Sequence, residues 1–259
     1  MENNLKEILK AAAKPKISII MQSFLGNYPG SRKDPDFKFM RAVKSFQTQL
    51  YKNCELIIVS DDCMQTKGLY ENHYKNDDNI RFVYVSRQPK EKSTYQKNEE
   101  GHKYFRGFPR RVGVGAATGD LITYMDSDDF LLPEFTLNLM IEYNKAPDVT
   151  WWVNRSWYDH SNMVFKEDQT FIDTNSDEKR EITDLPDKWN VTRVREGLVV
   201  MSPWLLMHKP VETVKWRDTW GGISEDVDFN SRLRKEYKNG AVMDRPTYAR
   251  CHFSEKWDV

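Results

Sequence analysis

Short, wholly apolar segments alternate with helical segments and polar loops through the first half of the chain. From Phe37 to Leu50, apolar residues recur at the spacing of an amphipathic helix. The apolar segments are rich in β-branched residues and end in polar ones: "KISIIMQSF" (16–24), "CELIIVSDD" (54–62), "NIRFVYVSR" (79–87) and "LITYMDSDD" (121–129). Strands that are apolar on both faces are typical of a parallel sheet covered by helices on both sides. The sequence therefore predicts an α/β fold with a Rossmann-like, mostly parallel sheet flanked by helices.

The length of 259 residues suits one large α/β domain or two small ones. We predict a single domain over residues 1–259, with one half over about 16–130 and the other over about 131–259. All eight tryptophans follow residue 150, at positions 151, 152, 157, 189, 204, 216, 220 and 257. We interpret the first half as a nucleotide-type sheet and the second as an aromatic-rich, variable half.

Charge and composition limit the partners of the chain. Lys plus Arg and Asp plus Glu both total 39, so the formal net charge is zero and no global field attracts nucleic acid or an anionic membrane. The N-terminal "MENNLKEILKAAAKPK" lacks the apolar core of a signal peptide, and the later apolar runs are too short to span a bilayer. The three cysteines lack the spacing of a disulfide framework, which indicates reduced thiols. We therefore predict a cytoplasmic protein with no transmembrane segment.

Three carboxylates, Asp126, Asp128 and Asp129, directly follow the apolar run of the fourth expected strand. A calcium loop would need a glycine at the sixth position from Asp126 and a glutamate at the twelfth, and both positions hold leucine. A second alternative is that Asp128 or Asp129 caps the helix expected near Pro133, which explains one carboxylate of the three. The remaining interpretation is a divalent cation held by one or two carboxylates and completed by substrate phosphates.

The stretch "GGISEDVDFNSRLRKEY" (221–237) predicts a helix with acidic residues in its first turn. The core-facing stripe of this helix consists of Asp226, Phe229, Leu233 and Tyr237. Asp226 is therefore expected to point inward, whereas Glu225 falls about 100° off the stripe. Burying a carboxylate costs free energy, and a general base that faces a hydroxyl is a functional reason to bury one. The alternative is that both carboxylates only stabilise the N-terminus of the helix.

Three stretches, in the same order along the chain, resemble the motifs of the family-2 glycosyltransferases: "SFQTQLYKNCELIIVSDDC", "RRVGVGAATGDLITYMDSDDFLLPE" and "GGISEDVDFNSRLRKEY". The resemblance extends from about Lys16 to His252, with a weaker match over 144–200. It implies the GT-A fold and a nucleotide-sugar donor, with a UDP-sugar as the first choice. It also implies an inverting transfer to a saccharide or other hydroxyl-bearing acceptor, with Mn²⁺ or Mg²⁺ bound at a D-x-D motif.

The resemblance implies roles for individual residues on the donor side. The donor-binding positions carried over from the family are Gln22, Ser23, Phe24, Asp61, Asp62, Arg111, Asp126 and Ser127. The chain departs from the family's usual pattern in these motifs. Gln-Ser-Phe replaces Pro-Thr-Tyr, Asp-Asp-Cys-Met replaces Asp-Asp-Gly-Ser, and Val112 replaces the asparagine after the arginine. A carboxylate of the Asp61–Asp62 pair can accept a hydrogen bond from a base N–H or a ribose hydroxyl.

The resemblance also implies a metal site and a catalytic pair. Asp128 and His252 match the metal-binding positions, and an imidazole beside carboxylates fits Mn²⁺ better than Mg²⁺. Asp226 matches the general base, with Glu225 beside it in the same catalytic motif. The matching acceptor-binding positions are Trp220, Gly221 and Gly222.

Two other functions stay open at the level of the sequence. A non-catalytic nucleotide-binding module is suggested by the departures at Val112 and Cys63, although the retained aspartates argue against it. A sugar transferase acting on modified DNA is suggested by the basic stretch 87–111, whose simpler interpretation is a solvated loop. Nucleic acid is therefore not the partner that we expect first.

Overall fold

The computed structural model describes residues 14–26, 35–86, 107–154, 156–159, 163–165, 170–173, 178–181, 190–193, 205–208, 214–217, 225–243 and 248–250. The described helices are α2 (Pro35–Gln47), α3 (Met64–His73), α4 (Gly107–Ala116), α5 (Phe135–Lys145) and α6 (Glu225–Glu236). The strands of the first half are β1 (Ile17–Ser23), β2 (Cys54–Asp61), β3 (Ile80–Val85), β4 (Leu121–Asp126) and β5 (Phe130–Leu131). The later strands are β6 (Trp151–Asn154), β7 (Ser156–Asp159), β8 (Met163–Phe165), β9 (Thr170–Asp173), β10 (Glu178–Glu181), β11 (Asn190–Arg193), β12 (Leu205–His208), β13 (Gly240–Met243) and β14 (Tyr248–Arg250).

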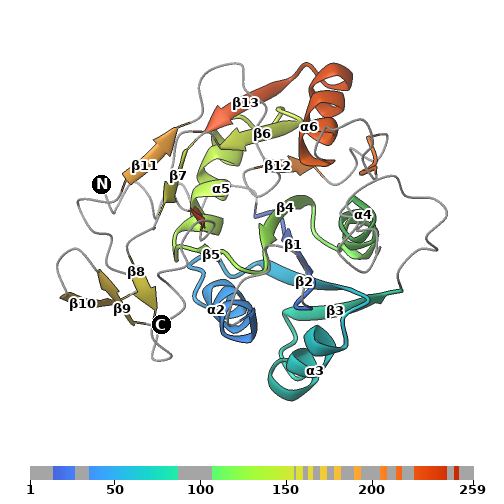
Figure 1. Cartoon of the computed structure of the whole chain (residues 1–259). Helices are drawn as coiled ribbons and strands as arrows, with labels where there is room; N and C mark the ends of the chain where they lie inside the picture. Colours follow the sequence, from blue (N-terminus) through green and yellow to red (C-terminus); the bar gives the residue numbers. More distant parts are fainter. Residues whose placement is uncertain are drawn as a thin grey trace.

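The main sheet of the described chain has the strand order β13-β6-β12-β4-β1-β2-β3 (Figure 1). The four strands expected from the sequence, β4-β1-β2-β3, pair in parallel. This confirms the predicted α/β fold with its mostly parallel sheet. The sequence did not predict how the second half extends this sheet. Strand β12 lies between β4 and β6 and is antiparallel to both, whereas β13 is parallel to β6.

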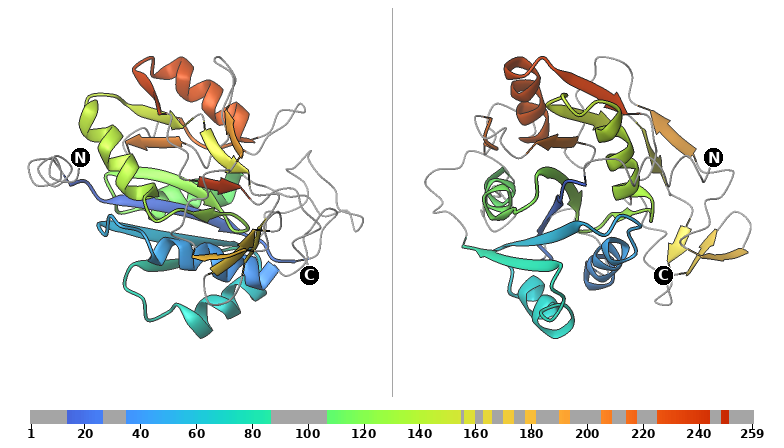
Figure 2. Two further views of the ribbon diagram at one scale, coloured as in Figure 1. Left: turned by 90° about the vertical axis from the view of Figure 1, so that its left-hand side faces the viewer. Right: turned by 180° about the vertical axis from the view of Figure 1, so that it is seen from behind.

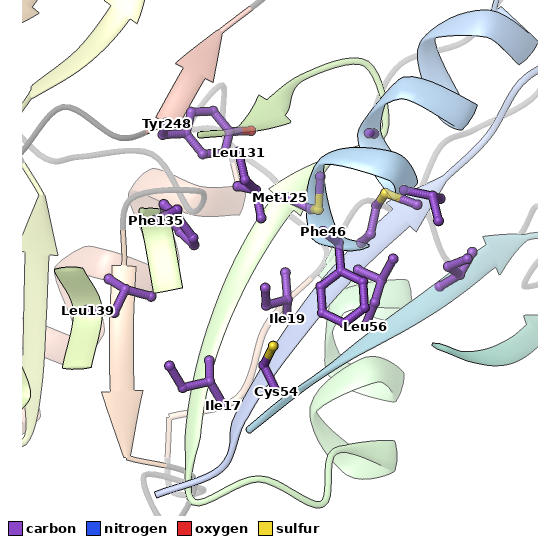
Figure 3. Packing of buried hydrophobic residues seen from close by; sticks show 14 of the residues in the cluster. Ile17, Ile19, Phe46, Cys54, Leu56, Met125, Leu131, Phe135, Leu139 and Tyr248 are labelled. Carbon is purple, nitrogen blue, oxygen red and sulfur yellow. The ribbon is translucent and has the colours of Figure 1, made fainter. Parts of the chain in front are cut away.

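Helices cover both faces of the parallel strands, as expected for strands that are apolar on both sides. Ile17, Ile19 and Met21 of β1 belong to one core cluster, which includes residues of α2 and α5. Ile20 of the same strand belongs to a second cluster, which includes residues of α6 and is packed against α4. Figures 1 and 2 show α2 and α3 on one side of β2 and β3, and α4 on the other. In Figure 3, Phe46 of α2 lies beside the β1 and β2 side chains of the first cluster.

Two smaller sheets lie in the second half of the described chain, with the orders β10-β9-β8 and β11-β7-β14-β5. Strand β5 comes just after β4 in the chain and pairs antiparallel with β14, which also pairs parallel with β7. The end of a central strand of the main sheet is therefore connected to strands that come much later in the sequence. The prediction of one domain over residues 1–259 stays a prediction.

Two composition-based expectations can be compared with the described residues. None of the helices in the described ranges is both long and apolar enough to cross a bilayer. Cys54 and Cys63 are buried free thiols, as predicted, and Cys251 lies outside the described residues.

Helix α4 packs closely on the sheet at Gly113. A Cβ atom at this position would lie 2.5 Å from Cγ2 of Ile20 and 3.1 Å from Cγ2 of Val59. A larger residue would push the helix away from β1 and β2, so glycine is required for this approach. Arg110 lies one turn before Gly113 on the same helix, and the close packing therefore holds its side chain near the sheet.

A buried glutamate joins the starts of three strands at the opposite end of the sheet from the acidic strand ends. The side chain of Glu55 is 3% exposed, and its Oε1 accepts hydrogen bonds from Ser18 Oγ (2.6 Å) and from the Thr118 N–H (2.7 Å). Its Oε2 accepts from Lys16 Nζ at 3.0 Å. Burial alone would raise the pKa of Glu55, but these hydrogen bonds outweigh it and lower that pKa to about 2.

We expect Glu55→Gln to lower the free energy of unfolding at neutral pH by about 2–3 kcal/mol, because charge-assisted hydrogen bonds are lost in a buried place. The pKa of Glu55 lies below its ordinary value of 4.5, so the stabilisation is present above that pH and is lost as the pH falls toward 2. Urea unfolding at several pH values measures this. The control is Glu71→Gln on α3, whose exposed pair with Lys67 contributes little. Equal stability of the two variants at neutral pH would contradict the prediction.

Candidate functional site

The polar residues predicted at the strand ends lie along one edge of the sheet. Gln22 of β1 is opposite Asp126 of β4, and β2 ends at Asp61 on the other side of β1. Phe24 and Asp61 are half-buried. Within the described ranges, Oε1 of Gln22 is buried without a hydrogen-bond partner. A buried acceptor of this kind could accept a hydrogen bond from a donor such as an N–H group of a ligand.

Asp62, just beyond β2, adopts an unusual backbone conformation. Its φ is 52°, in the left-handed region that residues other than glycine seldom enter. Its N–H donates to the Val85 carbonyl at 2.8 Å, and its carboxylate accepts from the Tyr84 hydroxyl at 2.6 Å. Neighbouring strand β3 thus holds the Asp62 backbone in a costly conformation, which is common at ligand-binding sites.

Ser23 lies deeper than the other residues predicted to bind a donor. It is 1% exposed, and its hydroxyl shares a hydrogen bond of 2.9 Å with the Thr66 hydroxyl of α3. This contact connects the end of β1 to α3. A role of Ser23 in donor binding stays a prediction.

The acidic turn, as we name residues 126–129, runs from the last residue of β4 through the turn that follows it. Asp126, Ser127 and Asp128 are half-buried, whereas Asp129 is buried. The Asp129 N–H donates to the Asp126 carbonyl at 3.3 Å. The Tyr248 hydroxyl donates to Asp129 Oδ2 at 2.6 Å and accepts from the Asp126 N–H at 3.2 Å. The carboxylate of Asp129 is therefore an internal group of the turn, and those of Asp126 and Asp128 lie nearer its surface.

The helix-cap alternative for the acidic turn is wrong. Helix α5 begins at Phe135, and the residue at its N-cap is Glu134, which makes no side-chain cap hydrogen bond. The acidic turn instead makes contacts inside the molecule: Nη2 of Arg41 on α2 donates to the Asp128 carbonyl oxygen. The turn is thus held by α2 and β14.

Arg110 of α4 links the acidic turn to the first turn of α6. Its Nη1 donates to Glu225 Oε1 at 2.7 Å, and its Nη2 lies 3.4 Å from Asp126 Oδ1. The residue is 6% exposed, and its guanidinium lies over the ring of Trp216, 4.9 Å from the ring centroid. Arg110 therefore supplies positive charge to carboxylates that come from two distant parts of the chain.

The sequence singled out Arg111 for donor binding and missed Arg110. Arg111 is exposed; its Nη1 lies 3.4 Å from the Trp216 carbonyl, and its guanidinium lies over the ring of Phe108. In an Arg-Asn-x-Gly stretch counted back from Gly113, the arginine falls on Arg110. That spacing is the signal that could have found Arg110, and the role of Arg111 stays a prediction.

The positive charge of Arg110 compensates only part of the negative charge of the surrounding carboxylates. Burial raises the pKa of Asp126 to about 6, against the opposing effect of the Arg110 charge. The negative charges of Asp128, Glu225 and Asp226 add to the rise. The site therefore has an excess of negative charge that a bound cation would relieve.

Helix α6 buries both carboxylates of the predicted catalytic pair. Asp226 and Glu225 are each 6% exposed, and Phe229 and Leu233 are fully buried as predicted. The expected inward position of Asp226 is confirmed, but the expectation that Glu225 lies off the buried side is wrong. The reason is Arg110, which covers this side of the helix and pairs with Glu225.

An aromatic group supports the Arg110 side of the site. The ring of Trp216 stacks on Phe229 with centroids 4.0 Å apart, and its Nε1 donates to the Tyr124 hydroxyl at 2.8 Å. Burial raises the pKa of Tyr124, so this hydroxyl stays protonated. The sequence did not predict Trp216 at the site. The predicted acceptor-binding residues Trp220, Gly221 and Gly222 and the predicted metal ligand His252 lie outside the described residues.

A metal ion at the acidic turn would need ligands beyond the described side chains. Within the described residues, no group of three or more His, Cys, Asp or Glu side chains could hold a metal ion. Asp128 offers hard oxygen donors near Asp126. This donor set fits a divalent cation that completes its coordination with the phosphate oxygens of a substrate, as Mg²⁺ and Mn²⁺ do.

Comparison with known proteins bears on the fold of the chain. No protein-family profile matches the sequence. Among solved structures, S. aureus TarS 1–349 in complex with UDP-GlcNAc aligns over 94% of this chain with a TM-score of 0.60 and 13% identity. The mannosyltransferase PcManGT from Pyrobaculum calidifontis, in complex with GDP-Man and Mn²⁺, aligns over 98% of this chain with a TM-score of 0.55 and 9% identity. The chain has a glycosyltransferase fold.

A curated protein with related sequence agrees with this glycosyltransferase fold. It is the GalNAc(5)-diNAcBac-PP-undecaprenol beta-1,3-glucosyltransferase of Campylobacter jejuni, which is 27% identical over 133 residues, or 51% of this chain. The aligned region is 36% of that relative, and the alignments cover 60% of the TarS chain and 64% of the PcManGT chain. The chain therefore spans less than two thirds of the length of each of these proteins.

Proposed function

We propose that the chain is a metal-dependent, inverting glycosyltransferase that transfers a sugar from a nucleotide diphosphate sugar to an acceptor hydroxyl. The observation that supports it best is the pairing of Arg110 with both Asp126 and Glu225. This pairing brings the strand-end carboxylates and the start of α6 to one place, where a donor and an acceptor would have to meet. The UDP-GlcNAc and GDP-Man complexes of proteins with this fold support a nucleotide sugar as the donor.

The donor would lie along the carboxyl ends of β1, β2 and β4. Gln22 and the Asp61–Asp62 pair would contact the nucleoside, and Oε1 of Gln22 would accept from a base N–H. Asp126, Ser127 and Asp128 would face the ribose and diphosphate. Residues Phe24 and Arg111 stay donor-binding predictions, and a UDP-sugar remains our first choice.

Transfer would proceed as a single displacement. The carboxylate of Asp226 takes the proton of the acceptor hydroxyl, whose oxygen forms the new bond to the anomeric carbon. The bond from that carbon to the diphosphate oxygen breaks, and its electron pair leaves with the nucleoside diphosphate. A divalent cation bound by Asp128, with His252 as a further predicted ligand, would neutralise the charge of the leaving diphosphate. Asp226, which matches the general base of the family, is our candidate for the base, and its neighbour Glu225 forms an ion pair with Arg110.

The acceptor would be bound by the second half of the chain. The name of the Campylobacter relative contains a PP-undecaprenol-linked saccharide, which supports a saccharide hydroxyl as the acceptor. Trp220, Gly221 and Gly222 stay the predicted acceptor-binding residues. Most of the basic stretch 87–111 lies outside the described residues, so the DNA alternative gains no support.

The function is tested by a donor screen. Purified protein with Mn²⁺ is incubated with each common nucleotide sugar, and released nucleoside diphosphate is measured. Release from one donor, increased by a saccharide acceptor, is the expected result. Tight binding of a nucleotide without any turnover across donors and acceptors would favour the non-catalytic module.

A related prediction concerns Asp128→Ala, which we expect to weaken UDP binding in Mn²⁺ by at least about 10- to 100-fold, since losing a group that only orients a metal ligand already has this effect. UDP affinity without metal should be weak in the wild type, because the carboxylates repel the diphosphate, and it should be no weaker in Asp128→Ala, which removes one of these charges. Calorimetric titration of UDP with Mn²⁺ or with EDTA measures both. The control is Asp148→Ala, an exposed residue after α5. If both variants bind UDP and Mn²⁺ alike, the acidic turn is not the metal site.

A further inference from the structure

Tyr248 of β14 contacts the acidic turn from a distant part of the chain. It is fully buried, and its hydroxyl donates to Asp129 Oδ2 at 2.6 Å and accepts from the Asp126 N–H at 3.2 Å. Figure 3 shows its ring beside Leu131 and near Phe135 in the core. One hydroxyl therefore bridges the first and the last residue of the acidic turn.

The pairing of β14 with β5 extends this attachment. Tyr248 is opposite Leu131 and Ala249 is opposite Phe130 in the antiparallel register. Because β5 begins immediately after the acidic turn, the hydroxyl and the backbone ladder hold the turn at neighbouring points. Strand β14 also pairs with β7, so the same strand belongs to the small sheet of the second half.

Helix α2 makes further contacts with the same segment. Arg41 donates to the Asp128 carbonyl oxygen, and the Leu131 N–H donates to Ser45 Oγ at 3.0 Å. These contacts bind the backbone of the turn and leave the direction of its side chains to be set elsewhere. The Tyr248 hydroxyl reaches the carboxylate of Asp129, and Arg110 reaches that of Asp126.

The hydrogen bond from Tyr248 stabilises the buried carboxylate of Asp129. Asp129 is 4% exposed, and a buried carboxylate is costly unless donors surround it. With a hydroxyl donor in place, Asp129 can stay inside, and the backbone that it shares with Asp128 keeps one conformation. Loss of that donor would leave the buried carboxylate with one hydrogen bond fewer, which would favour a conformation of the turn in which Asp129 moves toward water and shifts its neighbour.

We propose that Tyr248 is a positioning residue that fixes the acidic turn in the conformation that binds the diphosphate and its cation. Through β14, the small sheet of the second half is thereby coupled to the donor site. The inference rests on the proposed function, since it assumes that a nucleotide binds at the acidic turn. It assigns no direct contact between Tyr248 and the substrate.

The test compares Tyr248→Phe with Tyr51→Phe. Tyr51 is also a buried tyrosine, and its hydroxyl donates to the Pro15 carbonyl at 2.8 Å, away from the acidic turn. We expect Tyr248→Phe to bind UDP in Mn²⁺ about 10- to 100-fold more weakly, as for other residues that orient metal ligands. UDP binding in EDTA should not change. Tyr51→Phe should lose a similar amount of stability and keep its UDP affinity in Mn²⁺.

A second variant keeps the test decisive if Tyr248→Phe does not fold. Asp129→Ala removes the other partner of the hydrogen bond and should weaken UDP binding in Mn²⁺ to the same extent. Where all the variants fold, the double variant should bind no more weakly than either single one, since both remove one interaction. Wild-type affinity in a folded Tyr248→Phe, or in Asp129→Ala, would overturn the proposal. If the wild-type protein itself binds no UDP with Mn²⁺, the donor site fails and the role of Tyr248 fails with it.

Discussion

Replacing Asp226 with asparagine is expected to abolish most sugar transfer while donor binding is kept. The amide has the shape of the carboxylate, but it cannot take a proton at neutral pH. Removal of a general base usually lowers the rate by about 10²- to 10⁴-fold. Asp226 is buried in the first turn of α6, and its Oδ1 accepts from the Val227 N–H at 2.8 Å. The measurement is the transfer rate with the donor found in the screen, beside UDP affinity in Mn²⁺.

The alternative for Asp226, stabilisation of the helix N-terminus, predicts a different result. Asparagine caps a helix nearly as well as aspartate, so Asp226→Asn would then change almost nothing. Glu225→Gln is the matched control: it should lower stability, because it removes the ion pair with Arg110, and lower the rate less than Asp226→Asn. A transfer rate for Asp226→Asn within a few-fold of wild type would falsify its role as the base.

Replacing Arg110 with leucine is expected to lower the free energy of unfolding by about 3–5 kcal/mol, because removing one partner leaves buried charge uncompensated. Glu225 is 6% exposed and loses its partner at 2.7 Å, while Asp126 loses its nearby positive charge. Donor binding should weaken as well. The matched control is Arg111→Leu on the same helix, which should cost less than about 1 kcal/mol because Arg111 is exposed. Thermal or urea unfolding of both variants measures the difference.

The loss of stability caused by Arg110→Leu should also depend on pH. In the unfolded chain the pKa of Asp126 is about 3.9, and in the folded protein burial raises it to about 6. Folding therefore favours the protonated form, and the stability from this group is lost as the pH rises between these values. Arg110 opposes the rise, whereas Asp128, Glu225 and Asp226 increase it. Without Arg110 the pKa of Asp126 in the folded protein would rise further, so the variant would lose more stability than the wild type as the pH rises. The difference in stability between Arg110→Leu and the wild type should therefore be smaller at about pH 5 than at about pH 8. A deficit that is the same at both pH values would mean that Asp126 is not affected by Arg110.

The parallel strands could be predicted because their residues carry the signal themselves. Ile17 and Ile19 lie on one face of β1 and Ile20 on the other, and a sheet that is buried on both sides requires apolar residues on both faces. The inward direction of Asp226 was also predictable, since it follows from helical spacing relative to Phe229. Both are local patterns that a single segment contains.

The contacts of the site could not be predicted in the same way, because they join segments that are far apart in the chain. Tyr248 and Asp129 are 119 positions apart, and neither has a local pattern that requires the other. The burial of Glu225 depends on Arg110, which is 115 positions away. Helix spacing alone placed Glu225 off the core because it takes no account of a cation that arrives from another helix. Strand β12 is similar: four residues give too short a pattern to predict an antiparallel position between β4 and β6.

The position of β12 has a consequence for fragments of this protein. Strand β4 has β1 on one side and β12 on the other, so a chain cut near residue 130 would expose the apolar edge of this six-residue strand. Such an edge pairs readily with other chains. An isolated fragment 1–130 should therefore aggregate rather than fold, and adding fragment 131–259 during refolding should keep it in solution. The portion that we propose to bind the nucleotide would then depend on the C-terminal half for solubility as well as for activity.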